Sequence, residues 1–181
     1  MRNATRTLTG VPTRRRIING ATAALGGLAA GSGLMAEGRQ ESMKEVPATA
    51  ANKARTSLHQ EAHFKASAQR IYDMFLDSKQ FAAFSGMPAE IDPHAGGAFS
   101  MFGGLIVGRN VELIPDRRIV QAWRATHWDP GIYSIVKFEF KSQGSETTVI
   151  LDHTGFPEGE FDHLDPGWHE HYWDRLEKYL S

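Results

Sequence analysis

The 181-residue sequence contains no cysteine. The protein therefore cannot form a disulfide bond, use a thiolate nucleophile or bind a metal through thiolates. Short catalytic signatures are missing as well, since there is no Gly-x-Ser-x-Gly nucleophile turn, no His-Glu-x-x-His zinc helix and no glycine-rich phosphate loop. From these absences we predict no catalytic residue, no metal site and no cofactor.

Positive charge is scarce in most of the chain. Residues 1–56 carry nine Lys and Arg against three Asp and Glu, whereas residues 57–181 carry eleven against eighteen. The near-neutral total of −1 therefore combines a basic leader with an acidic body. Nucleic acids and anionic membranes attract clustered Lys and Arg, so the acidic body argues against both as partners.

The basic leader has the layout of an export signal. Three arginines at positions 14–16 follow Thr13 and precede Ile17 and Ile18, and residues 20–36 then form an uncharged run rich in Gly and Ala. The order Thr-Arg-Arg-x-apolar-apolar resembles the twin-arginine signal, which implies export of the folded protein. We therefore expect a periplasmic or other extracytoplasmic location and, once the signal is removed, no stable insertion in a membrane.

The sequence leaves the end of the leader open. We assign residues 1–36 to the signal, residues 37–57 to a flexible linker because they are polar and rich in Ala, and residues 58–181 to one folded domain. Cleavage after Ala36 and cleavage after Ala50 are both open. The alternative location is a membrane to which an uncleaved leader anchors the protein, although the Gly, Ser and Thr of the leader make it a poor span.

The first part of the domain predicts one strand and two short helices. Apolar and polar residues alternate over 58–66, as in a half-buried strand. Ser67 is a candidate N-cap for a helix over 68–76, and a second helix over about 79–84 ends at Gly86. This order of elements indicates an α+β domain.

A run of short strands follows, and we expect it to form a curved antiparallel sheet. Gly108 lies inside the longest of them, where we expect a bulge that lets the sheet curl. Asp165 as N-cap and Pro166 as the first helical residue predict a final helix that continues to Leu180. The predicted strands are 90–92, 98–102, 105–114, 118–126, 134–141 and 147–153.

Four motifs in a fixed order give the domain a family resemblance. They are Gly108-Arg109-Asn110-x-Glu112-Leu113-x-Pro115, Arg118-Ile119-Val120-Gln121-x-Trp123, Thr154-Gly155-x-Pro157 and Gly167-Trp168-x-x-x-Tyr172-Trp173. Over residues 58–180 the chain resembles the homologues of the activator of the 90-kDa heat-shock chaperone's ATPase, a branch of the START-like (SRPBCC) superfamily. The resemblance implies a helix-grip fold, in which a curved antiparallel sheet wraps around a long C-terminal helix and two short helices follow the first strand.

A curled sheet that grips a helix encloses a cavity unless side chains fill it. We predict a largely aromatic lining, with Gln121 and His153 as polar groups that could anchor the polar end of a ligand. The alternative for these side chains is ordinary core packing, which for His153 would include a hydrogen bond to a backbone carbonyl. The candidate ligand-binding residues are Phe81, Phe84, Phe99, Gln121, Trp123, Phe138, His153 and Trp173.

Three function classes follow from this interpretation. The first is a non-catalytic START-like domain that binds a small hydrophobic molecule between the sheet and the C-terminal helix. The resemblance implies a second, a co-chaperone-like module whose partner is a chaperone-like protein. The third is an enzyme of the cyclase or hydrolase type, which would need convergent polar groups in the same cavity.

Overall fold

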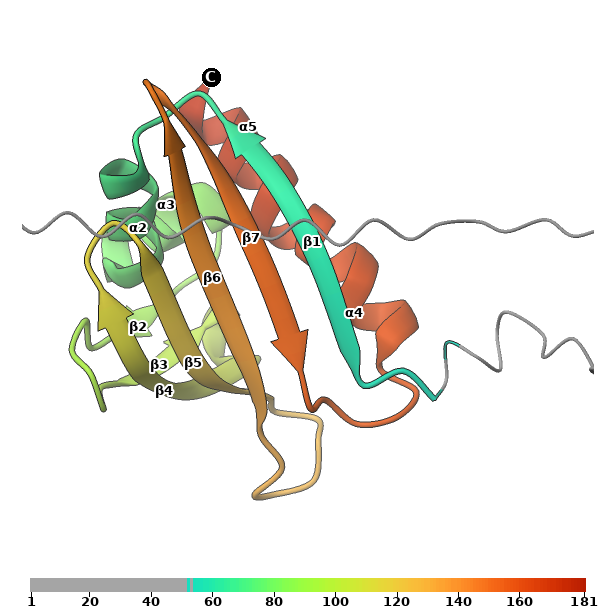
Figure 1. Cartoon of the computed structure of the whole chain (residues 1–181). Helices are drawn as coiled ribbons and strands as arrows, with labels where there is room; N and C mark the ends of the chain where they lie inside the picture. Colours follow the sequence, from blue (N-terminus) through green and yellow to red (C-terminus); the bar gives the residue numbers. More distant parts are fainter. Residues whose placement is uncertain (1–51, 53) are drawn as a thin grey trace, which may run out of the picture. The chain divides into compact units, whose positions relative to one another are not determined.

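Seven antiparallel strands form one curved sheet in the spatial order β1-β7-β6-β5-β4-β3-β2 (Figure 1). A computed structural model of the chain describes residue 52 and residues 54–181, so the predicted signal and most of the predicted linker lie outside the described residues. Within that described part, no helix is both long and apolar enough to cross a membrane. The strands are β1 (Ser57–Phe64), β2 (Glu90–Ile91), β3 (Ala98–Met101), β4 (Ile106–Ile114), β5 (Arg118–Ala125), β6 (Ser134–Gln143) and β7 (Glu146–Thr154).

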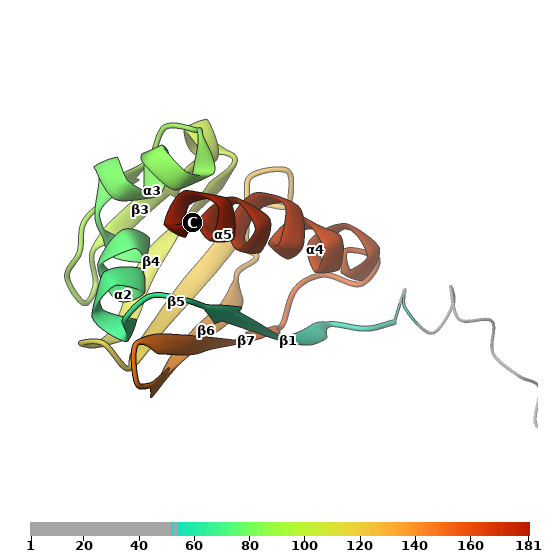
Figure 2. The ribbon, with the colours of Figure 1, turned by 90° about the horizontal axis from the view of Figure 1, so that it is seen from above.

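Two short helices separate β1 from β2, and a longer helical segment ends the chain. This last segment lies in the hollow of the sheet, with the two short helices beside its C-terminal end (Figure 2). The predicted helix-grip arrangement is therefore confirmed. The helices are α2 (Ala68–Leu76), α3 (Ser78–Ser85), α4 (Phe161–Trp168), the π-helical η2 (His169–Trp173) and α5 (Asp174–Leu180), and a 3₁₀ turn, η1 (Phe102–Gly104), follows β3.

Local capping chemistry sets the bounds of α2 and α3. The Ser67 hydroxyl accepts a hydrogen bond from the Arg70 amide at 3.3 Å, and the Asp77 carboxylate accepts one from the Gln80 amide at 2.8 Å. Such side-chain acceptors replace the missing partners of the first turn. Gly86 ends α3 in the left-handed conformation, with φ 72°. The predicted cap at Ser67 and the predicted end at Gly86 are both confirmed.

Strict alternation in the central strands supplies the inner face of the sheet. Val136, Phe138 and Phe140 of β6 are buried, as are Ile119, Gln121 and Trp123 of β5, while the residues that alternate with them are more exposed. Successive side chains of a strand point to opposite faces, so these residues all face the C-terminal helix. Sheet and helix therefore share one apolar core.

The predicted bulge at Gly108 is wrong. The register of β4 against β5 shifts between Asn110 and Glu112, whereas Gly108 pairs regularly with Phe99 of β3. Glycine is needed there for space, because an added β-carbon would overlap the carbonyl oxygen of Ala122 and the ring of Phe99. A glycine within a strand can mark a bulge or a close approach, and this one marks a close approach.

The final helix begins at Phe161, so the predicted start at Asp165 and Pro166 is wrong. Both residues lie inside α4. The N-cap is Glu160, and no side chain caps this end of the helix, which leaves the true start without a signal in the sequence. The proline cannot donate to the carbonyl of Asp162, and the helix accommodates this lost hydrogen bond close to its N-terminal end.

Two glycine substitutions test this account of the packing. Gly108→Ala should lower the free energy of unfolding by about 1–3 kcal/mol or more, because the new methyl group overlaps rigid backbone and a packed ring.

Gly167→Ala should raise the free energy of unfolding by up to about 1 kcal/mol, because this helical position has open space around its β-carbon. Urea unfolding curves of the two variants measure both values. Equal stability of the Gly108→Ala variant and the parent would contradict the account.

Candidate functional site

Two tryptophan side chains attach the C-terminal helix to the sheet. The indole nitrogen of Trp168 donates to Nδ1 of His153 in β7 at 3.2 Å, and that of Trp173 donates to Oε1 of Gln60 in β1 at 2.7 Å. The amide nitrogen of Gln60 in turn donates to the backbone oxygen and to the carboxylate of Asp165, at 2.9 and 2.8 Å. His153 and Gln60 are 0% and 8% exposed, so the two indole hydrogen bonds lie inside the core.

The π-helical turn brings both indoles to the same side of the helix. In an α-helix, residues five positions apart project about 140° from each other, since each residue turns about 100°. The i→i+5 hydrogen bonding of η2 widens the turn, and Trp168 and Trp173 lie with ring centroids 6.1 Å apart and planes only 23° apart. The extra residue in the turn therefore lets both rings reach the sheet.

The hydrogen bonds around His153 fix its tautomer. An indole nitrogen only donates, so Nδ1 of His153 is the acceptor toward Trp168 and Nε2 carries the proton. Nε2 lies 2.7 Å from the Ser134 hydroxyl oxygen, and that hydroxyl donates to the carbonyl oxygen of Trp123 at 3.0 Å. His153 thus donates to the serine and cannot take its proton, and burial lowers the pKa of His153 to about 3.

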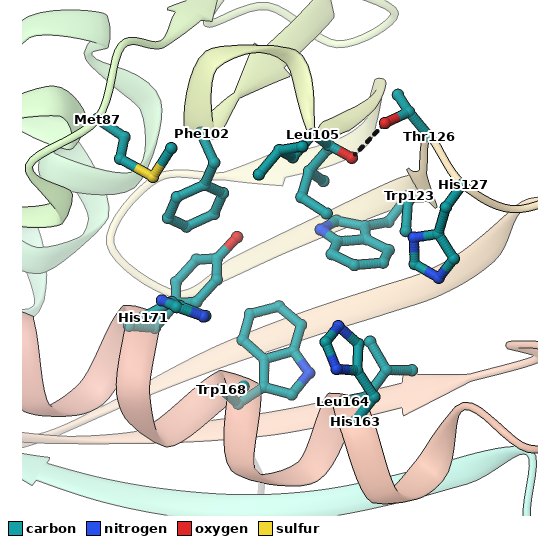
Figure 3. Close-up of a pocket in the computed structure, with 14 residues that line it drawn as sticks. Met87, Phe102, Leu105, Trp123, Thr126, His127, His163, Leu164, Trp168 and His171 are labelled. Atoms are coloured by element: carbon teal, nitrogen blue, oxygen red, sulfur yellow. Dashed lines mark hydrogen bonds between the residues drawn. The ribbon is translucent and has the colours of Figure 1, made fainter.

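A cavity of about 280 Å³ opens between the end of the sheet at β4–β5 and the α4–η2 part of the helix. Its floor is apolar and aromatic, as the close-up shows (Figure 3). Its rim consists of exposed side chains, so the cavity is open to solvent on one side. The buried floor residues are Phe102, Trp123, Ala125, Leu164, Trp168 and Tyr172, and the exposed rim residues are Leu105, Thr126, His127, His163 and His171.

Two contacts hold the rim in place. The Thr126 hydroxyl donates to the carbonyl oxygen of Leu105 at 3.0 Å, as the dashed line in Figure 3 marks. Nε2 of His127 lies 3.1 Å from the carboxylate of Glu160, at the start of α4. The loop after β5 is thereby tied to the turn before β4 and to the helix, so the cavity is largely preformed.

A protein-family model matches the described domain. The model described as "Activator of Hsp90 ATPase homolog 1-like protein" matches residues 65–181. The chain belongs to this family. The match includes nearly all of the described domain, and the predicted resemblance is confirmed.

Curated relatives of this family align with the same region. An "Activator of 90 kDa heat shock protein ATPase homolog" of Dictyostelium discoideum is 34% identical over 119 residues, which cover 65% of this chain and 31% of that protein. The human "homolog 1" is 27% identical over 115 residues, covering 64% of this chain and 34% of that protein. The chain therefore spans about a third of the length of these relatives.

Solved structures share the fold over the whole domain. A crystal structure of an HSP90 activator from Plasmodium falciparum has a TM-score of 0.67 at 27% identity, covering 70% of this chain and 96% of that chain. CalU16 from Micromonospora echinospora has a TM-score of 0.60 at 20% identity, covering 69% and 76%. At that identity the likeness of CalU16 shows the fold alone.

Of the eight predicted ligand-binding residues, only Trp123 lines this cavity. The other seven lie in the core away from its lining. Gln121 donates to the Asn110 side chain at 3.0 Å, and His153 is bonded on both nitrogens. Ligand binding by these seven stays a prediction. Those in the core are Phe81, Phe84, Phe99, Gln121, Phe138, His153 and Trp173.

Sequence reasoning did not assign most of the lining to a site. Trp168 and Tyr172 both belong to the predicted final helix, and their spacing of four residues could have marked one shared face. Leu105, predicted as the first residue of a strand, lies in a turn, as does His127. The rim was therefore outside the reach of pattern analysis.

The protonation of His153 gives a pH-dependent prediction. The unfolded chain binds a proton at this residue below pH ~6.5, whereas the folded chain does so only near pH 3, so stability falls as the pH drops through this window. Each pH unit costs about 1.4 kcal/mol. In long-range ¹H–¹⁵N NMR spectra, His153 should keep the neutral Nε2–H pattern at pH 5. Titration of this ring near 6.5, as in the urea-unfolded chain, would contradict the assignment.

Proposed function

We propose that the domain binds a small lipophilic molecule in the cavity between β4–β5 and the C-terminal helix, without catalysing a reaction on it. The observation that carries the proposal is the partly open apolar cavity of about 280 Å³ over an aromatic floor. Ligand sites are typically concave, mostly apolar and largely preformed, at roughly 300–1,000 Å³. The cavity volume is just below this range, and its open side lets a longer ligand extend into solvent.

The buried Ser134–His153 pair argues against a hydrolase of the serine type. A catalytic histidine must accept the proton of the nucleophile, whereas Nε2 of His153 donates to Ser134 and Nδ1 is occupied by Trp168. Both side chains are almost fully buried and neither lines the cavity. This arrangement favours the binding function over the cyclase or hydrolase alternative.

A leucine at position 167 tests the binding site. Gly167 lines the cavity and an added β-carbon there meets no atom within 4 Å, so Gly167→Leu should fill the cavity without disturbing the backbone. Native mass spectrometry of protein purified from its natural host should show a bound lipophilic species in the parent and its loss in this variant. The neutral dye N-phenyl-1-naphthylamine should lose at least tenfold in affinity.

The matched control is Glu177→Leu, which adds the same side chain at an exposed position of α5. Its dye affinity should equal that of the parent. A parent protein that is always ligand-free and that does not bind the dye would overturn the proposal.

A second candidate is a protein-interaction module that stimulates a chaperone ATPase. It is favoured by the names of the relatives and by the likeness to the Plasmodium falciparum HSP90 activator at 27% identity. A steady-state ATPase assay of a purified Hsp90 chaperone with increasing amounts of the full chain separates the two candidates. A saturating rise that Gly167→Leu leaves unchanged would support the second, and no rise would remove its main support.

We also propose that the chain is exported by the twin-arginine route, on the evidence of the arginines at 14–16 and the uncharged run after them. Arg14→Lys combined with Arg15→Lys keeps the charge but removes the guanidinium pair. Cell fractionation should then find the protein retained in the cytoplasm. Unchanged export of this double variant would contradict the proposal.

A further inference from the structure

Two buried polar atoms on the cavity lining have no hydrogen-bond partner among the described residues. They are the indole nitrogen of Trp123 and the hydroxyl of Tyr172, two residues that line the cavity with side chains that are 3% and 4% exposed. Buried polar groups are nearly always paired, because an unpaired one has lost its water without replacement. An unpaired group that faces a cavity therefore indicates a partner that enters the cavity.

Both atoms are available as donors. An indole nitrogen can only donate. Burial raises the pKa of Tyr172, so its hydroxyl keeps its proton across the ordinary pH range. The N–H of Trp123 lies close enough to the phenolic oxygen to lower that pKa in part, although the two groups do not have hydrogen-bond geometry. The two donors thus lie together at one place on the lining.

The surrounding rings restrict how far either side chain can turn. Trp123 is packed by His153 at 5.1 Å, Trp128 at 5.5 Å and Trp168 at 6.0 Å between ring centroids. The ring of Tyr172 lies 4.3 Å from that of Trp168. In Figure 3 the nitrogen of Trp123 is turned toward the middle of the lining side chains. The donors are therefore preorganised, and an acceptor that enters the cavity can pair with them.

We propose that the ligand carries a neutral carbonyl oxygen that accepts hydrogen bonds from Trp123 Nε1–H and Tyr172 Oη–H; this inference rests on the proposed binding function. A carbonyl oxygen has two lone pairs and so matches two donors. Among the described residues, the lining includes no Lys or Arg, and its only titratable side chains besides Tyr172 are the exposed histidines 127, 163 and 171. Nothing on the floor would neutralise a buried carboxylate, which favours a ketone, aldehyde, ester or amide.

A matched pair of probes tests this inference. The ketone 2-acetylnaphthalene and the alkene 2-isopropenylnaphthalene have the same shape and differ in the carbonyl oxygen. The parent should bind the ketone about three- to tenfold more tightly than the alkene, the usual effect of a buried hydrogen bond. The infrared carbonyl stretch of the bound ketone should lie at lower frequency than that of the ketone in hexane.

Tyr172→Phe removes one donor and leaves the ring. Because the hydroxyl has no hydrogen-bond partner in the described part of the chain, the unfolding midpoint should not fall, and the variant keeps its fold. Its affinity for the ketone should drop about three- to tenfold, while its affinity for the alkene stays equal to that of the parent. The carbonyl stretch should move back toward higher frequency.

Tyr179→Phe is the control, because it removes a tyrosine hydroxyl from the exposed part of the same helix, 45% exposed and outside the cavity lining. It should change neither affinity. Equal binding of both probes by the parent, unaltered by Tyr172→Phe, would overturn the carbonyl inference and leave apolar binding standing. Failure of the parent to bind either probe would overturn both.

Discussion

The pairing of two helix tryptophans with two buried polar side chains of the sheet is the interaction on which the structure depends. The sheet could hold an apolar helix at many rotations and shifts, because apolar packing is not directional. The hydrogen bonds from Trp168 to His153 and from Trp173 to Gln60 select one position of the helix on the sheet. They also require the π-helical turn, since a regular α-helix would point the two indoles away from each other.

The cavity follows from that placement. The core beneath the middle of the helix is filled, with Phe75 stacked on Phe138 at 4.9 Å and Phe138 edge-on to Trp168 at 5.7 Å. At the start of β4 and the end of β5, the helix presents Gly167 and Tyr172, and no side chain of the described residues closes the space. The fixed helix thus shapes the hollow and orients the two unpaired donors, Tyr172 from the helix side and Trp123 from the sheet side.

The sequence predicts the scaffold better than the site. Alternation puts Gln60 on the apolar face of the strand predicted over 58–66, and the sequence also predicts His153 to face inward. Capping chemistry placed the start of α2 and the end of α3, because these properties depend on neighbouring residues. The start of the last helix was missed, since the Asp165-Pro166 pair resembles a start signal and Glu160 provides none. The cavity lining joins turns, strand ends and a π turn, and no local pattern encodes which of these meet.

A double-mutant cycle on Trp173 and Gln60 tests the central claim most directly. Trp173→Phe and Gln60→Leu each leave a buried polar partner unpaired, so each alone should lower the free energy of unfolding by about 1–3 kcal/mol. Because the second change removes a partner that the first has already orphaned, the double variant should lose less than the sum, with a coupling of about 0.5–3 kcal/mol. Losses that add to within about 0.3 kcal/mol would show that the indole hydrogen bond does not hold the helix on the sheet.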